Sequence, residues 1–219
     1  AGSAASAGAA GVTVAAGATR AVLAAVAVVS VVAGAGAAAD SEAAAPQGAG
    51  EPMDTARCFR HLFAPRRALL RALPQSALLQ LEAAVDESER WHAGEIRIAI
   101  ESSLEPGEVW RGKTPRERAL EVFAALGVWD TEANNGVLIY VLLADHDVEI
   151  VADRGYNDRV EAAEWAAICE DIDAEFRSGR YPEGLVAGVR RVGQIIATHF
   201  PQRPGQRDEN ELPNRPALL

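Results

Sequence analysis

The chain has 219 residues, which is enough for one domain of ordinary size with additional segments at its ends. Its formal net charge of −10 argues against a surface that follows nucleic-acid phosphates, so we expect no nucleic-acid partner. The two cysteines, Cys58 and Cys169, are far apart and belong to no metal-binding motif, so we expect two unpaired thiols.

Residues 1–53 form a low-complexity segment that is rich in alanine and glycine and contains one basic residue, Arg20. Residues 21–39 carry no charge, which is close to the minimum length of a membrane span and also resembles a signal peptide. If residues 20–39 are a genuine apolar segment, the protein is membrane-anchored or exported. Alternatively, the segment is a misassigned extension, translation starts at Met53, and the protein is cytoplasmic.

The globular domain is predicted over residues 54–200. Its first part, residues 53–73, alternates arginines with large apolar residues, so it either packs its leucines on the domain or contacts acidic lipid or a partner. A helix is predicted from Pro74 to His92. Residues 95–104 then alternate apolar and polar side chains, as a strand with one wetter face does.

A capping box at Thr114 and Glu117 marks the beginning of the next helix. This helix leads to an unbroken apolar run, residues 137–143, which is typical of a strand covered on both faces. A strand, a helix and a strand in this order predict two parallel strands with a right-handed connection. A polar turn around residues 145–147, expected to have no other role, leads to a third, antiparallel strand at residues 148–153.

Two amphipathic helices are predicted after Gly155, with Gly179 and Pro182 between them. The first should bury a stripe that includes Ala163. Residues 201–219 are polar and rich in proline, and they are predicted to form a disordered tail. The elements together predict an α/β domain with a mixed sheet.

Polar residues flank the second and third strands at one end of the predicted sheet. Asp130, Asn134 and Asn135 precede the second strand, and Asp153 and Arg154 follow the third. Because these strands are adjacent and antiparallel, we expect the five side chains to lie at one end. Asp130, Asp153 and Asn134 are candidate ligands for Ca²⁺ or Mg²⁺, and Arg154 and Asn135 are candidates for anion binding. The alternative is that they are ordinary turn residues.

Standard hydrolase and kinase signatures are absent, including the nucleophile elbow, the HExxH motif and the Walker loop. The histidines, His61, His92, His146 and His199, are scattered, and we expect them at surface or helix-end positions. No catalytic residue can be assigned, and the lack of a nucleophile–base pair favours binding over catalysis.

Three blocks of the sequence resemble the TPM domain family, which is named after a thylakoid lumen protein, a photosystem II repair protein and a nematode receptor accessory protein. The blocks are residues 94–97, 134–139 and 148–155, and the order of elements agrees from about Pro74 to Phe200. The resemblance implies an α/β fold with a mixed β-sheet of about four strands sandwiched between helices. It also implies calcium binding at strand-end carboxylates, and either an acid phosphatase activity or a role in maintaining membrane complexes.

One position departs from the family pattern. Members often carry Gly-x-Gly after the third strand, and here Asp153 stands at the first glycine position. The added carboxylate either strengthens a cation site or shows that the backbone facing an anion has changed. The preferred function is therefore a non-catalytic module that binds a protein partner or a membrane complex. The alternative is a metal-dependent phosphatase-like hydrolase, in which Asp130 and Asp153 hold the cation and Arg154 holds the phosphate.

Overall fold

The structure is a computed structural model that describes residues 55–64, 66–202 and 210–219. The apolar segment predicted at residues 21–39 and the alternative start at Met53 lie outside these described residues, so the compartments that depend on them stay predictions. Within the described part of the chain, every helix is too short or too polar to cross a bilayer.

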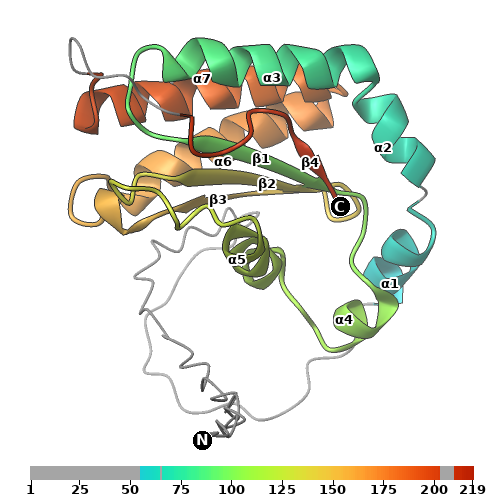
Figure 1. Cartoon of the computed structure of the whole chain (residues 1–219). Coiled ribbons are helices and arrows are strands. Elements are labelled where there is room, and N and C mark those ends of the chain that lie inside the picture. The colour runs from blue at the N-terminus through green and yellow to red at the C-terminus, as the bar shows by residue number, and fades with distance from the viewer. Residues whose placement is uncertain (1–54, 65, 203–209) are drawn as a thin grey trace, which may run out of the picture.

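The described residues form seven α-helices, one 3-10 helix and four strands (Figure 1). In chain order they are α1 (Thr55–Leu62), α2 (Arg66–Ala72), α3 (Gln75–Glu89), β1 (Ile96–Glu101), α4 (Pro106–Trp110), α5 (Pro115–Ala125), β2 (Val137–Leu142), β3 (Asp147–Ala152), η1 (Arg154–Tyr156), α6 (Ala162–Arg177), α7 (Tyr181–His199) and β4 (Ala217–Leu218).

The four strands form one mixed sheet in the order β3-β2-β1-β4. β1 and β2 are parallel and are connected through α4 and α5, whereas β2 and β3 form an antiparallel hairpin. Ile98 of β1 lies opposite Ile139 of β2, which lies opposite Ile150 of β3. The predicted α/β fold with a mixed sheet is therefore confirmed. The predicted relative directions of the first three strands are also confirmed.

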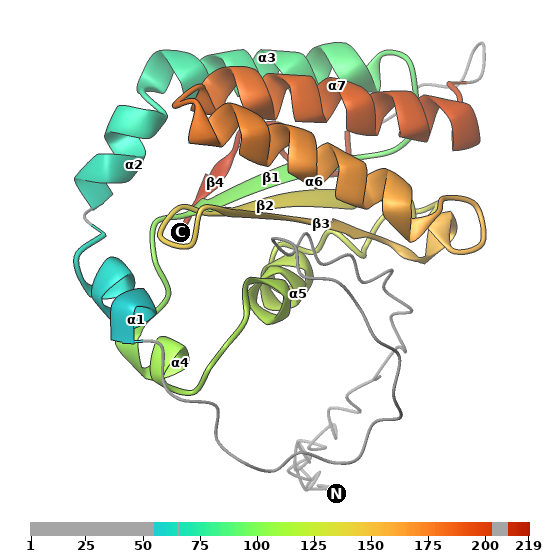
Figure 2. The same ribbon diagram turned by 180° about the vertical axis from the view of Figure 1, so that it is seen from behind.

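Helices cover both faces of the sheet (Figures 1 and 2). The larger core lies between the sheet and helices α3, α6 and α7, and it contains Ile98, Ile139 and Ile150. The smaller core lies under α5 and contains Phe123 and Leu138. Because successive side chains of a strand point to opposite faces, a strand between two cores has no polar face, which explains the unbroken apolar run of β2.

The face of β1 that was predicted to be wetter is buried. All six residues of β1 are buried, including Arg97. The C-terminal segment, residues 210–219, lies over this strand: β4 pairs with β1, and the Arg97 guanidinium donates to the backbone carbonyl oxygens of Pro213 and Arg215. The prediction of a disordered tail is therefore wrong for residues 210–219, because this segment completes the sheet edge and supplies acceptors to a buried cation.

The predicted helices are present, with one change of phase. The capping box is confirmed: Thr114 Oγ1 accepts the Glu117 N–H, and the Glu117 carboxylate accepts the Thr114 N–H. In α6, Ala163 was predicted to be buried but is exposed. Because the helix begins at Ala162, its buried face passes through Trp165 and Ile168 and leaves Ala163 on the solvent side. The two cysteines are free thiols, as predicted.

Candidate functional site

Two loops meet at the end of the sheet where β1 and β2 begin and β3 ends. They are residues 127–136 and residues 153–157, and together we call them the rim. The Gly155 N–H donates to the Asn134 carbonyl oxygen at 2.9 Å, which connects the two loops. A Cβ added at Gly155 would lie 2.3 Å from the same oxygen, so only glycine allows this approach. The predicted convergence of the two loops is therefore present.

Asp153 is the most buried acidic residue of the rim, with 2% of its surface exposed. Its backbone N–H donates to the Gly136 carbonyl oxygen at 2.9 Å, and its Oδ1 accepts the Arg154 N–H at 2.7 Å. Its Oδ2 is buried and has no hydrogen-bond partner among the described residues. Burial raises the pKa of Asp153, against the opposing effects of the Arg154 N–H and the nearby Arg154 charge. The Arg154 side chain itself points to an exposed position.

The adjacent asparagines hold the shape of the first loop. Asn134 has a φ of +53°, a left-handed conformation that asparagine tolerates better than most residues. Asn135 is buried; its N–H donates to Thr131 Oγ1 at 3.0 Å, its Nδ2 donates to the Ala93 carbonyl oxygen, and its own carbonyl oxygen accepts the Tyr156 hydroxyl at 2.8 Å. The remaining side-chain atom of Asn135, Oδ1, is buried without a partner among the described residues, and an oxygen suits a cation rather than an anion.

Asp130 lies in the same loop as the asparagines, and its side chain is exposed. Its backbone N–H donates to the Gly127 carbonyl oxygen at 2.9 Å, which places it at a turn. Across the described ranges, no group of three or more His, Cys, Asp or Glu side chains could hold a metal ion. A cation at the rim would therefore have to combine the two aspartates with amide or carbonyl oxygens and water, as Ca²⁺ often does.

The C-terminal segment brings a further carboxylate to the rim, which the sequence analysis missed. Glu211 accepts the backbone N–H of Glu132 at 3.0 Å. Glu95, just before β1, accepts the N–H groups of Glu211 and Leu212 at 3.1 and 3.2 Å. No apolar period marks this segment, because backbone groups rather than a hydrophobic stripe anchor it. The available signals were Leu212, which is buried, and the apolar run at residues 217–219, of which Ala217 and Leu218 form β4 and pack against the two cores.

The turn between β2 and β3, at the opposite end of the sheet, has more than the turn role predicted for it. Asp145 Oδ2 accepts from Arg57 at 2.8 Å, and Asp145 Oδ1 lies 3.0 Å from His61 Nε2. His61 Nδ1 accepts the Leu104 N–H at 3.0 Å, and the ring is buried; of the two positions predicted for this residue, it takes the helix end and not the surface. These contacts attach α1 to the turn.

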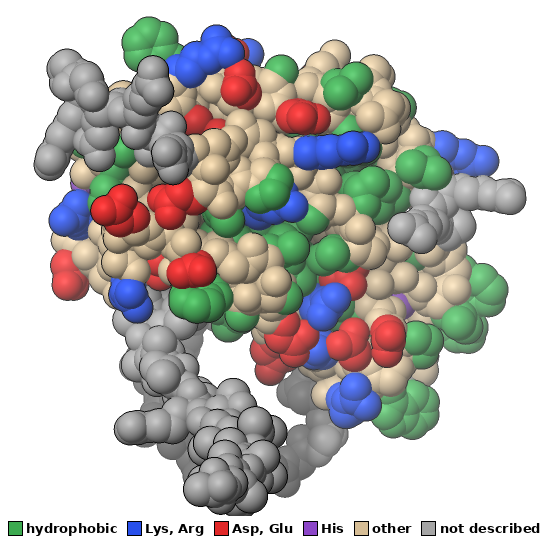
Figure 3. Space-filling view, in the orientation of Figure 1, with side chains coloured by type: hydrophobic (Ala, Val, Ile, Leu, Met, Phe, Trp, Pro, Cys, Tyr) green, Lys and Arg blue, Asp and Glu red, His purple; other side chains and the backbone are tan. Residues whose placement is uncertain are grey.

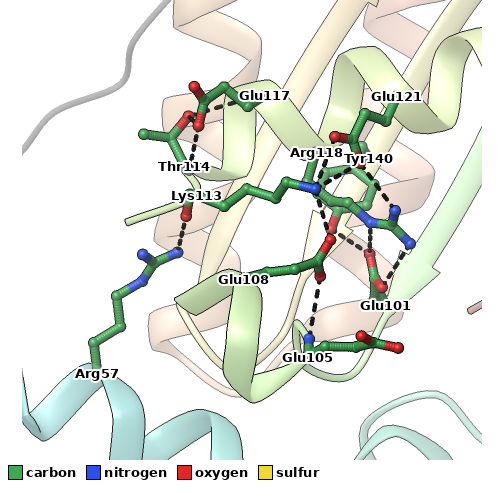
Figure 4. A network of polar contacts seen from close by, with 10 residues as sticks. All are labelled: Arg57, Glu101, Glu105, Glu108, Lys113, Thr114, Glu117, Arg118, Glu121 and Tyr140. Carbon is green, nitrogen blue, oxygen red and sulfur yellow. Dashed lines mark hydrogen bonds and ion pairs between the residues drawn. The ribbon is translucent and has the colours of Figure 1, made fainter. Parts of the chain in front are cut away.

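A network of paired charges near α4 and α5 stabilises the fold (Figure 4). The Tyr140 hydroxyl donates to Glu101 Oε2 at 2.6 Å, and Arg118 donates to both oxygens of the same carboxylate at 2.9 and 3.0 Å. Lys113 pairs with Glu108 at 2.6 Å. Because burial and Glu101 raise the pKa of Tyr140, its phenol stays protonated. The named groups are satisfied by one another, so we assign this network to packing.

One serine–histidine contact was missed by the sequence analysis, although its spacing of four residues in a helix is readable. Ser88 Oγ lies 2.9 Å from His92 Nε2, and burial lowers the pKa of His92 to about 4. His92 is fully buried just after the end of α3, so of the two positions predicted for it, surface or helix end, the surface position is wrong. A Cβ at Gly193 would lie 1.9 Å from Ser88 Oγ, so this hydroxyl packs closely against the backbone of α7, at the wall of a surface pocket that Trp91 and Arg190 also line.

Comparison with known proteins identifies the family. Residues 71–195, more than half of the chain, match the TPM domain, and the chain therefore belongs to the TPM domain family. It is also similar to the BA42 protein of the psychrophilic bacterium Bizionia argentinensis, whose structure was determined by NMR. The identity is 32%, the TM-score is 0.59, and the match covers 67% of this chain and 94% of that one. No curated protein matched the sequence.

Proposed function

We propose that this TPM domain is a non-catalytic module that binds a protein partner or a membrane complex and takes up a divalent cation, Ca²⁺ or Mg²⁺, at the rim. The observation that carries the cation site is the buried, unpartnered Oδ2 of Asp153. A buried carboxylate oxygen without a hydrogen-bond donor is costly, so a cation beside Oδ2 would stabilise the ionised form of Asp153. Asn135 Oδ1 is a second buried oxygen on the same rim that lacks a partner among the described residues.

The composition of the rim argues against a serine, cysteine or histidine nucleophile. Residues 127–136 and 153–157 contain none of these three residue types, and the hydroxyl of Thr131 already accepts the Asn135 N–H. A phosphatase-like hydrolase at this position would therefore have to use a metal-activated water or an aspartate nucleophile. The feature that favours this second candidate function is Arg154, because an exposed guanidinium beside a cation could bind a phosphate.

Thermal unfolding with and without Ca²⁺ or Mg²⁺ tests the cation site. We expect a cation present at about one hundred times its Kd to stabilise the folded state by about 2.7 kcal/mol, which raises Tm by several degrees. Asp153→Asn should remove this response, and Asp130→Asn should weaken it. Glu170→Gln, which neutralises an exposed carboxylate on α6, is the matched control and should respond as the parent does. An Asp153→Asn protein that still gains the full shift would contradict the site.

Hydrolysis of an aryl phosphate separates the two candidate functions. For a non-catalytic module, we expect the parent and Asp153→Asn to release phosphate at the same background rate in the presence of the cation. A rate in the parent that depends on both the cation and Asp153 would establish the hydrolase instead. Arg154→Gln should then raise KM, because Arg154 is the candidate phosphate ligand.

A further inference from the structure

Helix α1 is amphipathic, and its polar side faces the domain. Arg57 and His61 contact Asp145, and His61 is the only buried residue of the helix. The large apolar residues point outward: Phe59 is 61% exposed, Leu62 is 62% exposed, and Phe63, in the turn that follows, is 69% exposed. We call these three apolar side chains the docking face.

The docking face is locally ordered and lies at one corner of the molecule. The rings of Phe59 and Phe63 are stacked, with centroids 6.1 Å apart and planes 5° from parallel. Helix α4, which packs against α1, adds the exposed Trp110. Figure 3 shows hydrophobic side chains gathered at the corner where α1 and α4 lie. Exposed apolar side chains that cluster in this way mark a surface that another structure covers.

The charge of the residues around the docking face indicates what kind of partner covers it. Residues 55–73 contain five arginines and no acidic residue, whereas the whole chain has a net charge of −10. Arg60 and Arg71 are exposed. Phenylalanine and leucine beside arginine are the composition of helices that lie in the interface of an anionic bilayer. An anionic bilayer would repel the acidic surfaces among the described residues, so α1, which has no acidic residue, is better suited than they are to face it.

The sequence before α1 favours the same orientation. Residues 21–39 carry no charge, and fifteen residues separate this run from α1. Fifteen residues of extended chain reach about 50 Å, so an apolar run inserted in a bilayer would keep α1 close to the bilayer surface.

We propose that α1 docks on an anionic bilayer, with Phe59, Leu62 and Phe63 among the lipid headgroups and the exposed Arg60 and Arg71 near the phosphates. The docking rests on the proposed binding function, of which it names the surface and the partner. It is independent of the cation site at the rim.

Fluorescence from a single labelled position tests the docking in the full-length chain. Leu62→Cys, made in a Cys58→Ser/Cys169→Ala background, carries an environment-sensitive dye. Leu79→Cys on α3 is the control, because Leu79 is also exposed and lies on a different helix. We expect a blue shift at position 62, and none at position 79, with vesicles of phosphatidylcholine and phosphatidylglycerol. Vesicles of phosphatidylcholine alone should give a much smaller shift, and salt should weaken the response.

Removing the two phenyl rings provides the second variant. Phe59→Ser/Phe63→Ser should reduce the apparent affinity of the labelled protein for anionic vesicles at least about tenfold, because two apolar side chains no longer enter the interface. An unchanged Tm shows that the variant is folded. Reading the dye at position 62 separates docking of α1 from insertion of residues 21–39, which the variant leaves intact.

Four results would overturn the docking. They are no shift at position 62, equal shifts on neutral and anionic vesicles, equal shifts at positions 62 and 79, and a shift that grows with protein concentration without vesicles. The last result would identify a second copy of the chain as the partner. A change of Tm with Ca²⁺, measured on the same protein, shows whether the cation site stands regardless of the outcome for α1.

Discussion

Burial sets the protonation state of Glu89, a carboxyl group at the end of α3. Its Oε1 accepts the Ile96 N–H at 3.2 Å, and Glu95 lies close by. Burial raises the pKa of Glu89 to about 8; the Ile96 N–H opposes this shift, and repulsion from Glu95 adds to it. Glu89 is therefore mostly protonated at neutral pH, at the place where the C-terminal segment crosses β1.

The raised pKa of Glu89 predicts a pH-dependent stability. In the unfolded chain Glu89 ionises near pH 4.5, and in the folded chain near pH 8, so the unfolded state binds fewer protons between these values. The free energy of unfolding should fall as pH rises through this window. Glu89→Gln should escape this loss, so its stability relative to the parent should increase by about 2–4 kcal/mol from about pH 5 to about pH 8.

Urea denaturation of both proteins across that range measures the effect. Burial also raises the pKa of Glu149 to about 7, and this contribution has the same sign, but it is common to both proteins and cancels in the difference. Parallel pH profiles for the parent and Glu89→Gln would show that Glu89 ionises normally in the folded chain.

The C-terminal segment acts as a structural element although only β4 is regular. Arg97 reaches its carbonyl acceptors across a sequence separation of 116 residues, and Glu95 binds two N–H groups of the same segment. Burial lowers the pKa of Arg97, because removal from water disfavours the charged guanidinium. The segment therefore accepts hydrogen bonds from the buried Arg97 of β1 and donates hydrogen bonds to the buried Glu95 just before β1.

Removal of residues 210–219 should lower the free energy of unfolding by about 3 kcal/mol or more, because Arg97 and Glu95 lose charge-assisted hydrogen bonds. Arg97→Met should reduce the additional cost of the truncation, since the methionine needs no carbonyl acceptors. A double-mutant cycle by urea denaturation measures this coupling. Strict additivity of the truncation and Arg97→Met would mean that the segment does not stabilise the fold through Arg97.

At the scale of the whole molecule, each end of the sheet has a buried carboxylate oxygen without a partner among the described residues, Asp153 Oδ2 at the rim and Asp147 Oδ1 at the other end, and the two ends differ in the groups around it. The rim has buried oxygens of Asp153 and Asn135 without partners among the described residues. At the opposite end, Asp145 is surrounded by Arg57, Arg60 and His61, which attach α1 with its apolar residues outward. The first end is suited to a small cation and the second to a large surface, so the cation and the bilayer would bind at separate places.

Asp145→Ala should release α1 without unfolding the domain. His61 and Arg57 would lose their buried acceptor, so the helix would open more often. We expect hydrogen exchange in residues 55–64 to be at least about tenfold faster, with exchange in the strands unchanged. Asp171→Ala, which removes an exposed ion pair of α6 with Arg191, is the control and should leave α1 protected. Unchanged exchange in α1 would show that other contacts hold the helix.

Sequence by itself determined the parts of this protein that depend on neighbours within a few residues. The capping box of α5, the apolar run of β2 and the turn glycines are local, so the helix order and the mixed sheet could be predicted, as could the family. The meeting of the loops that contain Asn134 and Asp153 also followed, because adjacent antiparallel strands bring these two loops to one end of the sheet.

Only the tertiary structure decided which polar groups are buried and with whom they pair. Asp145 meets Arg57 across 88 residues, Arg97 meets the C-terminal segment, and the amide of Asn135 is engaged by Ala93. Likewise, the sequence shows only that α1 is amphipathic, whereas the structure shows that its polar side packs against the domain. Periodicity reports that a helix has two faces, but the position of a distant acceptor decides which face turns inward, because a buried charge must be paired.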